Sequence, residues 1–275
     1  MKSGIHQEVK LERQDPGKYY KALFDLENRV AVIIGGTGVL CGEMAWGLLQ
    51  AGARVVLVGR NKEKSDHHFQ RWGCSAEDAR FFKADVTQRD QIAQIIPQVL
   101  DWYGHIDIWI NGATIAPPAP YFEITDEQFE SVIDVNLKAV HMACQAIGKH
   151  WIDHKEKGCI INMSSMAAMR PLSRTFIYSL AKAGLQNLTQ NLGREWATYG
   201  IRVNALCPGF FPAEQNRAIL DAQRVEDIMR QTPMGRFGEP EELIGATLLL
   251  ASERAGQFIT GSNLVIDGGF SVMSI

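Results

Sequence analysis

The features that the sequence lacks exclude several classes of protein. Its 5 cysteines are scattered without C-x-x-C spacing, which favours reduced thiols over a disulfide framework or a zinc cluster. No apolar run is as long as a membrane span, and the charged amino-terminal stretch has no signal-like apolar core. A net charge of -3 gives no indication of a nucleic-acid-binding surface. We therefore expect a cytoplasmic protein that binds a small molecule, and neither nucleic acid nor a membrane.

The sequence does contain enough apolar residues for one large domain, being 46% hydrophobic and 21% charged over 275 residues. Residues 1–25 are polar and aperiodic and are expected to form an arm, with residues 26–275 as the domain. Further along, short apolar runs alternate with helical patterns, which predicts an α/β fold with a doubly wound parallel sheet and helices on both faces. The expected strands are residues 30–34, 54–58, 80–84, 106–110, 159–163, 201–206 and 263–266.

A glycine-rich turn connects the first strand to the first long helix, in the stretch "VAVIIGGTGVLCGEMAWGLLQ". Gly36 and Gly38 match the first two glycines of G-x-G-x-x-G/A, the dinucleotide-binding fingerprint of a Rossmann fold. Cys41 occupies the third position. That position serves helix-to-strand packing more than phosphate contact, so we expect Cys41 to affect packing without removing a phosphate ligand.

The residue after the second strand bears on the choice of cofactor. NAD enzymes place Asp or Glu there for the ribose 2′-hydroxyl, whereas an arginine favours the 2′-phosphate of NADP. This chain has Arg60 with no adjacent carboxylate. NADP(H) is therefore the favoured cofactor and NAD(H) the alternative. In the other interpretation, Arg60 is a solvated residue at the start of the next helix.

A second motif, "SSMAAMRPLSRTFIYSLAK", carries groups suited to carbonyl chemistry. Tyr178 and Lys182 are spaced to share one helix face, and Ser165 lies 13 residues before the tyrosine. An adjacent ammonium favours the phenolate and brings a tyrosine towards useful acid–base strength. A serine hydroxyl can hydrogen-bond the same carbonyl oxygen. The motif thus predicts interconversion of a carbonyl and an alcohol.

Together these pieces resemble the short-chain dehydrogenase/reductase family over residues 25–275. The matching motifs occur in family order: the glycine turn, "ADV", "INGA", "DVNL", Ser165, "YSLAK", "RVNALCPG" and "DGGF". The resemblance implies that Tyr178 is the general acid/base and that Lys182 lowers its pKa and holds the nicotinamide ribose. It also implies that Ser165 orients the substrate carbonyl and that Asn136 holds a water of a proton relay.

The same resemblance implies a set of cofactor contacts spread over the ends of the strands. They are Gly35, Gly36, Thr37, Gly38, Val39, Leu40, Arg60, Asp85, Val86, Asn111, Gly112, Ala113, Tyr178, Lys182, Pro208, Gly209 and Phe211. The family also forms homotetramers, for which we expect the long helices at 127–151 and 176–199 and the apolar carboxyl terminus to supply the two-fold interfaces.

An irregular segment follows the sixth strand, from residue 207 to about residue 234, and is expected to be a substrate lid. It resembles the family branch of D-mannonate oxidoreductase or fructuronate reductase-like proteins, which implies a keto-sugar acid or similar polyhydroxy carbonyl as substrate. Gln215 and Asn216 suit hydroxyl groups, and Arg217 suits a carboxylate. Arg170 and Arg174 are rival carboxylate partners.

Two alternative functions follow from other residues. Phe210, Phe211 and Pro212 would also suit a reductase of less polar ketones. Ile34, Thr114 and Ala213 depart from the family pattern at the cofactor, and would be compatible with a catalytically weak, dinucleotide-binding regulatory subunit. His150 and His154 have a spacing that can bind zinc, but the sequence provides no third ligand, so no metal site is expected.

Overall fold

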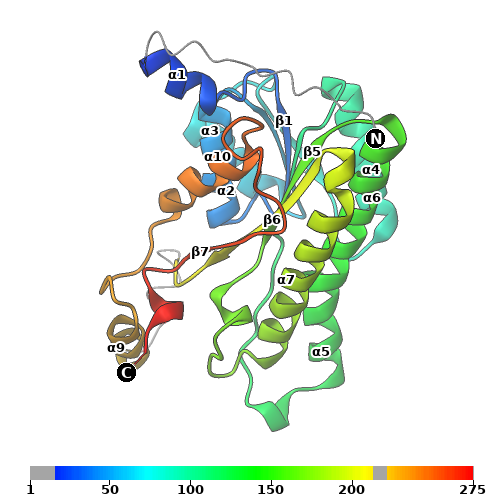
Figure 1. Ribbon diagram of the computed structural model, residues 1–275. Helices are drawn as coiled ribbons and strands as arrows, with labels where there is room; N and C mark the ends of the chain where they lie inside the picture. Colours follow the sequence, from blue (N-terminus) through cyan, green and yellow to red (C-terminus); the bar gives the residue numbers. More distant parts are fainter. Residues whose placement is uncertain (1–15, 213–221, 275) are drawn as a thin grey trace, which may run out of the picture.

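The computed structural model describes residues 16–212 and 222–274, which contain one parallel sheet flanked by helices (Figure 1). All seven strands expected from the sequence are confirmed, and their order is β3-β2-β1-β4-β5-β6-β7. The chain crosses from one half of the sheet to the other between β3 and β4, as in a doubly wound fold. The strands are β1 (Val30–Ile34), β2 (Arg54–Gly59), β3 (Ala79–Lys83), β4 (Ile108–Asn111), β5 (Gly158–Met163), β6 (Ile201–Pro208) and β7 (Asn263–Ile266).

Helices cover both faces of the sheet (Figure 1). In β1, Val30 and Val32 belong to a core cluster with α4, α6 and α7, whereas Ala31 and Ile33 belong to a cluster with α2, α3 and α10. Both faces of the strand are therefore apolar, as its sequence predicted. The helices are α1 (Pro16–Leu23), α2 (Val39–Gln50), α3 (Lys62–Trp72), α4 (Arg89–Tyr103), α5 (Asp126–Ile133), α6 (Ala139–His154), α7 (Phe176–Trp196), α9 (Ala222–Gln231) and α10 (Ile244–Ala251).

Local chemistry sets several helix ends. Asn61 caps α3 by accepting a hydrogen bond from the Lys64 backbone N–H at 3.2 Å, and Gly73 ends that helix in the left-handed conformation. Thr125 and Gln128 form a capping box at the start of α5. The long helix expected over residues 127–151 is present, but a π-helical turn separates α5 from α6.

The structure corrects two expectations of irregular chain. Pro16 begins α1 rather than interrupting an arm, because proline suits the first position of a helix. The carbonyls of Ala22 and Leu23 at the end of α1 accept hydrogen bonds from Arg254 and Ser252 at 3.2 and 2.7 Å. In the segment expected to be a lid, residues 222–231 form α9. None of the helices in the described ranges is long and apolar enough to span a membrane.

Candidate functional site

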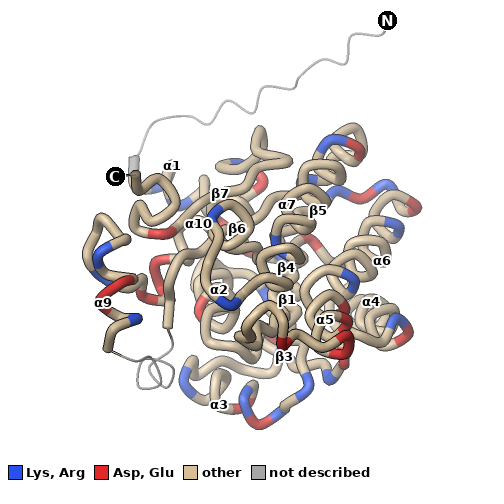
Figure 2. The backbone as a smooth tube through the Cα atoms, turned by 90° about the horizontal axis from the view of Figure 1, so that it is seen from below, with Lys and Arg blue, Asp and Glu red and all other residues tan. Residues whose placement is uncertain are grey.

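The carboxyl ends of the parallel strands bring most of the expected site residues to one edge of the sheet. Charged residues lie mainly on outer helices such as α3, α4, α6 and α9, whereas the strands at the centre are largely uncharged (Figure 2). A site at this edge is therefore built from backbone groups and a few polar side chains. The residues that follow the strands include Gly35, Arg60, Asp85, Gly112, Ser165 and Gly209.

The glycine turn after β1 leaves room and donors for an anionic ligand. Gly35 has φ +76°, and a Cβ there would lie 2.6 Å from the Ala113 backbone nitrogen. A Cβ on Gly36 would lie 2.8 Å from the Ile33 carbonyl oxygen. Gly38 precedes α2 and provides no side-chain cap, so the first N–H groups of α2 can meet a ligand instead. This cradle fits the diphosphate of a dinucleotide.

Cys41 is accommodated in this turn because its neighbour has no side chain. Its sulfur lies where a Cβ on Gly112 would have to be, so the two positions are complementary in size. Cys41 is 5% exposed, and burial raises the pKa of its thiol to about 12. The cysteine is therefore a neutral packing residue, and the phosphate-binding backbone of the turn is intact.

A histidine of α3 packs beside the glycine turn, a contact that the sequence did not predict. His68 of α3 packs against Gly42, where a Cβ would lie 2.5 Å from the imidazole Cε1. Its ring stacks on Trp72 with centroids 5.2 Å apart and lies beside the backbone of Thr37. Burial lowers the pKa of His68, so the ring is neutral near pH 7. The sequence signal was Gly42 itself, a glycine inside a helix that faces α3.

Arg60 and Asp85 lie beside the same turn. Thr37 packs against Gly59, where a Cβ would lie 2.9 Å from the threonine hydroxyl, and Arg60 follows directly and is exposed. Within the described ranges Arg60 has no ion-pair partner. Asp85 accepts hydrogen bonds from the backbone and hydroxyl of Thr87 at 2.9 and 2.8 Å, which lower the pKa of its carboxyl. These positions suit the adenosine end of a dinucleotide.

The side chain of Asn111 points into the core. Its amide nitrogen donates to Asn162 at 2.9 Å, and its oxygen accepts from the Trp109 indole at 2.9 Å. Asn162 in turn donates to Thr189 of α7 at 2.9 Å. This buried network joins β4, β5 and α7 and gives the Asn111 side chain a structural role, while its expected contact with the cofactor stays a prediction. Its backbone still lies at the carboxyl edge.

Tyr178, Lys182 and Ser165 converge as the motif predicted. Tyr178 and Lys182 lie on consecutive turns of α7, and Ser165 begins a 3₁₀ turn, where its hydroxyl oxygen accepts from the Ala167 N–H at 3.1 Å. The side chains of Ser165 and Thr114 lie beside that of Tyr178, where their hydroxyl groups favour its ionised form. Thr114 was counted in the sequence as a departure, yet it contributes a hydroxyl to this cluster.

Burial is the main influence on the pKa of Tyr178 in this structure, and the expectation that Lys182 lowers that pKa stays a prediction. Burial raises the pKa of Tyr178, and the neighbouring hydroxyl groups of Ser165 and Thr114, which would stabilise a phenolate, oppose that rise only in part. The ammonium of Lys182 donates to the Met163 carbonyl at 2.7 Å and lies 5.6 Å from the centre of the Tyr178 ring, over its face. Burial also lowers the pKa of Lys182 to about 8.

Asn136 lies in the π-helical turn Asp134–Lys138 that separates α5 from α6. Single π-helical turns inside helices are frequent at functional sites. The side chain is fully buried and accepts a 2.5 Å hydrogen bond from the Thr114 hydroxyl. The turn thus connects the helical layer to the cluster around Tyr178.

The substrate side of the edge is only partly described, because Ala213, Gln215, Asn216 and Arg217 lie outside the described residues. Phe211 packs against Gly238, and Phe210 packs edge-on against Phe270 with centroids 5.3 Å apart. Pro208 ends β6, and a Cβ on Gly209 would lie 2.7 Å from the Asp267 Cα. This close packing holds the start of the expected lid against the carboxyl-terminal "DGGF" turn.

The two described arginines near the site differ in their contacts. Arg170 donates to the Ser271 carbonyl at 2.5 Å. The Arg174 guanidinium has no ion-pair or hydrogen-bond partner within residues 16–212 and 222–274, and its backbone has φ +61°. Arg174 lines a groove of about 560 Å³ together with residues of α9 and Phe210. Of the two, Arg174 is therefore available to a ligand.

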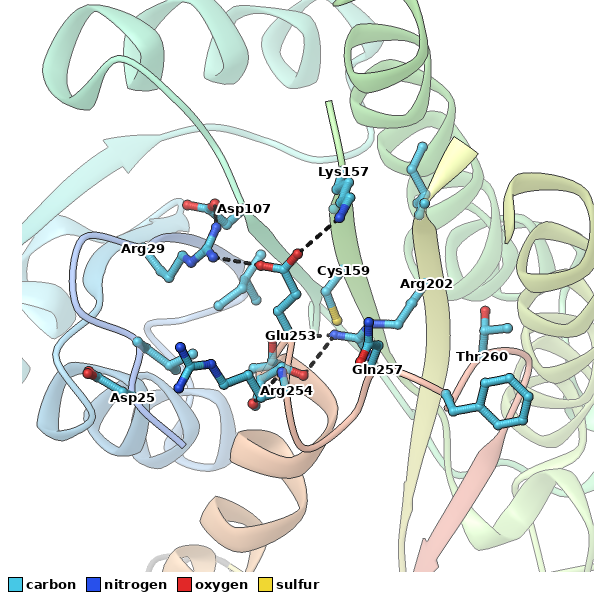
Figure 3. A pocket seen from close by; sticks show the side chains of 18 of the residues that line it. Asp25, Arg29, Asp107, Lys157, Cys159, Arg202, Glu253, Arg254, Gln257 and Thr260 are labelled. Carbon is cyan, nitrogen blue, oxygen red and sulfur yellow. Dashed lines mark hydrogen bonds and ion pairs between the residues drawn. The ribbon is translucent and has the colours of Figure 1, made fainter. Parts of the chain in front are cut away.

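A cavity of about 640 Å³ lies at the opposite edge of the sheet, and Figure 3 shows side chains that line it. Its charged groups pair with one another: Arg29 bridges Asp107 and Glu253 at 2.7 and 2.6 Å, and Lys157 lies 3.4 Å from Glu253. The cavity therefore belongs to a structural network that joins distant parts of the chain. Across the described residues, no group of three His, Cys, Asp or Glu side chains could hold a metal ion.

Comparison with known proteins gives the family. A family model described as enoyl-(acyl carrier protein) reductase matches residues 40–271. An uncharacterized oxidoreductase, UxuB, of Bacillus subtilis is 34% identical over 271 residues, covering 91% of this chain and 97% of the relative. Gluconate 5-dehydrogenase of Gluconobacter oxydans is 34% identical over 254 residues, covering 91% and 97%. The chain belongs to the short-chain dehydrogenase/reductase family.

As a short-chain dehydrogenase/reductase, the protein is an NAD(P)-dependent dehydrogenase that acts on CH–OH groups. The crystal structure of a gluconate 5-dehydrogenase from Burkholderia cenocepacia, in complex with NADP and tartrate, matches this chain with a TM-score of 0.85 and 33% identity, covering 93% of this chain and 100% of that one. The two gluconate 5-dehydrogenases are named for a sugar-acid substrate.

Proposed function

We propose that this short-chain dehydrogenase/reductase is an NADP(H)-dependent enzyme that interconverts a keto-sugar acid, or a similar polyhydroxy carbonyl, and its alcohol. The observation that carries the proposal is the convergence of the Ser165 and Thr114 hydroxyls on Tyr178, directly above Lys182. It lies at the same sheet edge as the glycine cradle. The relatives named for sugar acids support the substrate class.

In the direction of reduction, the chain's own residues hold and supply the proton. When bound, the reduced nicotinamide supplies the hydride. Ser165 already accepts a hydrogen bond from Ala167, so its hydroxyl proton is left to bind the carbonyl oxygen. The raised pKa of Tyr178 keeps its hydroxyl protonated at pH 7, and it donates that proton as negative charge develops on the carbonyl oxygen. In this proposal Lys182 holds the nicotinamide ribose, and Asn136 fixes the Thr114 hydroxyl by accepting its hydrogen bond.

The catalytic assignment is tested with Tyr178→Phe, which removes the proton donor and keeps the ring. NADPH affinity should be unchanged within about twofold while turnover falls by roughly a factor of 10³ or more, in the range expected for loss of general acid–base catalysis with its positioned hydroxyl. Cofactor binding by fluorescence titration and steady-state kinetics supply the two readouts. A variant that retains turnover would remove Tyr178 from the mechanism.

Cofactor choice rests on Arg60, which is exposed beside Thr37 and has no ion-pair partner among the described residues. A guanidinium can bind a 2′-phosphate through two charge-assisted hydrogen bonds. Arg60→Ala should weaken NADPH binding by roughly 1–3 kcal/mol and leave NADH binding nearly unchanged. Arg54→Ala, at the other end of β2, is the control. Equal losses for both cofactors would show that Arg60 does not bind the phosphate.

Arg174 is the favoured carboxylate partner among the described residues, because its guanidinium is unpaired there and Arg170 is engaged by Ser271. A left-handed backbone at a non-glycine residue is also frequent at functional sites. Arg217, outside the described residues, remains part of the proposal. Arg174→Gln should raise KM for the sugar acid about tenfold or more, but not for the matching neutral sugar. Arg170→Gln should leave the KM for the sugar acid and the KM for the neutral sugar unchanged.

The substrate class is tested by a steady-state screen with NADPH of fructuronate, tagaturonate, 5-ketogluconate, neutral keto sugars and an apolar ketone. The fructuronate and tagaturonate arms address the D-mannonate oxidoreductase-like branch. An order-of-magnitude preference for the apolar ketone would favour the alternative in which Phe210 and Phe211 select less polar ketones. In that case the sugar-acid proposal fails, whereas the assignment of Tyr178 is unaffected.

A further inference from the structure

Thr114 connects Asn136 to Tyr178, and the hydrogen bonds of Asn136 fix the direction of that connection. The Asn136 amide nitrogen donates to the carbonyls of Val132 and Ile115 at 2.9 and 2.8 Å. Its oxygen is therefore the atom that faces Thr114, and it accepts from the threonine hydroxyl at 2.5 Å. Because a hydroxyl has one proton, Thr114 in this arrangement can only accept a hydrogen bond from Tyr178.

The hydroxyl groups of Ser165 and Thr114, both beside Tyr178, thus differ in their hydrogen-bond partners. Ser165 has its oxygen occupied by the Ala167 N–H, and its proton is free for a substrate oxygen. Thr114 has its proton committed to Asn136, and its oxygen faces Tyr178. Asn136 is fully buried, so water does not compete for its oxygen. With its proton donated to Asn136, Thr114 can accept a hydrogen bond from the Tyr178 hydroxyl when no substrate is present.

We propose that Thr114 is a positioning residue for proton transfer, whose hydroxyl turns from Asn136 to the Tyr178 oxygen when that oxygen becomes a phenolate. This inference rests on the proposed role of Tyr178 as general acid/base. A hydrogen bond to a charged oxygen is stronger than one to a neutral oxygen, so the phenolate attracts the threonine proton more strongly than the Asn136 amide oxygen does. Thr114 departs from the family pattern in the sequence, and this proposal gives its hydroxyl group a function.

The step balances without another co-reactant. As the hydride adds to the carbonyl carbon, the Tyr178 O–H bond breaks and the new alcohol O–H bond forms. At Thr114 no covalent bond changes, because its hydroxyl only rotates about the Cβ–Oγ bond. Asn136 has no proton to pass on, since its oxygen is an amide acceptor. The phenolate regains its proton from solvent water, so Thr114 stabilises the charge and does not extend a relay.

The kinetic test compares Thr114→Val, which keeps the shape and removes the hydroxyl, with Thr114→Ser, which restores it. The substrate is the compound turned over fastest in the screen above, assayed as its alcohol with NADP⁺ across pH. In Thr114→Val the apparent pKa governing kcat/KM should rise by about one unit, with kcat/KM at pH 7 about tenfold lower. Thr114→Ser should stay within about twofold of wild type. An unchanged pH profile in Thr114→Val overturns the proposal, whatever its stability.

A second readout needs no substrate. NMR of carbon-labelled tyrosine in the NADP⁺-bound enzyme follows ionisation of each phenol, and Tyr178→Phe identifies the resonance of Tyr178. That resonance should titrate about one pH unit higher in Thr114→Val than in wild type. Titration at the same pH contradicts the proposal. An active Tyr178→Phe variant would instead refute the proposed function, so the two failures are distinguishable.

Discussion

At the glycine turn, the Cys41 sulfur fills the space that a side chain at position 112 would need. The size of side chain tolerated at either position therefore depends on the residue at the other. A Cβ on Gly112 would collide with the Cys41 sulfur and would also lie 3.1 Å from the Ile34 carbonyl oxygen. Protein interiors are close-packed, and an extra methyl group in such a place displaces its neighbours. A cysteine in the third position of the fingerprint is therefore tolerated because the facing residue is glycine.

Gly112→Ala should lower the free energy of unfolding by about 1–3 kcal/mol in the wild-type background. In a Cys41→Gly background the same substitution should be much less destabilising, because the sulfur is gone. Denaturant unfolding of the two single variants and the double variant gives the coupling energy. Equal losses in the two backgrounds would mean that Cys41 and Gly112 do not compete for space.

Lys182 is a buried lysine, and the burial of its ammonium group makes the stability of the protein depend on pH. Its pKa in the folded protein is about 8, lowered from 10.5 mainly by burial. Between these two values the unfolded chain binds more protons than the folded one, so the contribution of Lys182 to stability rises with pH across that window. Below it, the folded protein bears the full cost of burying the ammonium.

Lys182→Met should therefore be more stable than wild type at pH 7, by about 1–3 kcal/mol, while losing activity. The gain should shrink as pH rises from about 8 towards 10.5, where the wild-type amine becomes neutral in both states. Urea unfolding at a series of pH values measures this difference. A constant difference across the series would show that the buried charge is not its cause.

At the scale of elements, α2 and α3 meet where Gly42 faces His68. The imidazole occupies the place of a Gly42 side chain and reaches the backbone of Thr37 in the glycine turn. The two helices are also joined by an ion pair between Glu43 and Arg71. The position of α3 therefore supports the phosphate-binding turn, although none of its residues forms part of that turn.

Gly42→Ala should displace His68, lowering the unfolding free energy by about 1–3 kcal/mol and weakening dinucleotide binding. Gly245→Ala is the matched control, since Gly245 is a helical glycine of α10 with nothing within 4 Å of an added Cβ. There alanine should stabilise by about 0.5–1 kcal/mol through helix propensity alone. Thermal unfolding with and without NADPH measures both effects. Similar behaviour of the two variants would contradict the role given to His68.

The strands could be predicted from the sequence because parallel strands buried on both faces leave unbroken apolar runs, as in β1 and β2. Tyr178, Lys182 and Ser165 could be predicted because two lie on one helix face and the third ends a strand. The link from Thr114 to Asn136 could not, since it joins side chains 22 residues apart across a π-helical turn. Hydrogen bonds of this kind depend on tertiary geometry and leave no periodic pattern.

At the scale of the whole molecule, exposed aromatic residues gather near the amino-terminal ends of α5 and α7. Phe122 is 99% exposed, Tyr121 is 63% exposed, and Tyr121 packs edge-on against Phe176 with centroids 5.1 Å apart. Phe129 of α5 is also exposed. Exposed apolar side chains gathered in this way are typical of a surface that another subunit covers.

The homotetramer expected from the sequence should have four times the 30.6 kDa chain mass in light scattering. Phe129→Glu should lower the mass by placing a charge in the apolar interface, whereas Glu130→Gln, its neighbour on α5, should leave it unchanged. A monomer at micromolar concentration would contradict the expectation.

The network at the opposite edge of the sheet has a consequence for folding during synthesis. Arg29 can pair with Asp107 once β4 has left the ribosome, but its other partner, Glu253, is synthesised far later. The Leu23 carbonyl at the end of α1 likewise waits for Ser252. We therefore expect α1 to be one of the last elements to dock. Most of the polypeptide must emerge from the ribosome before α1 is held in place.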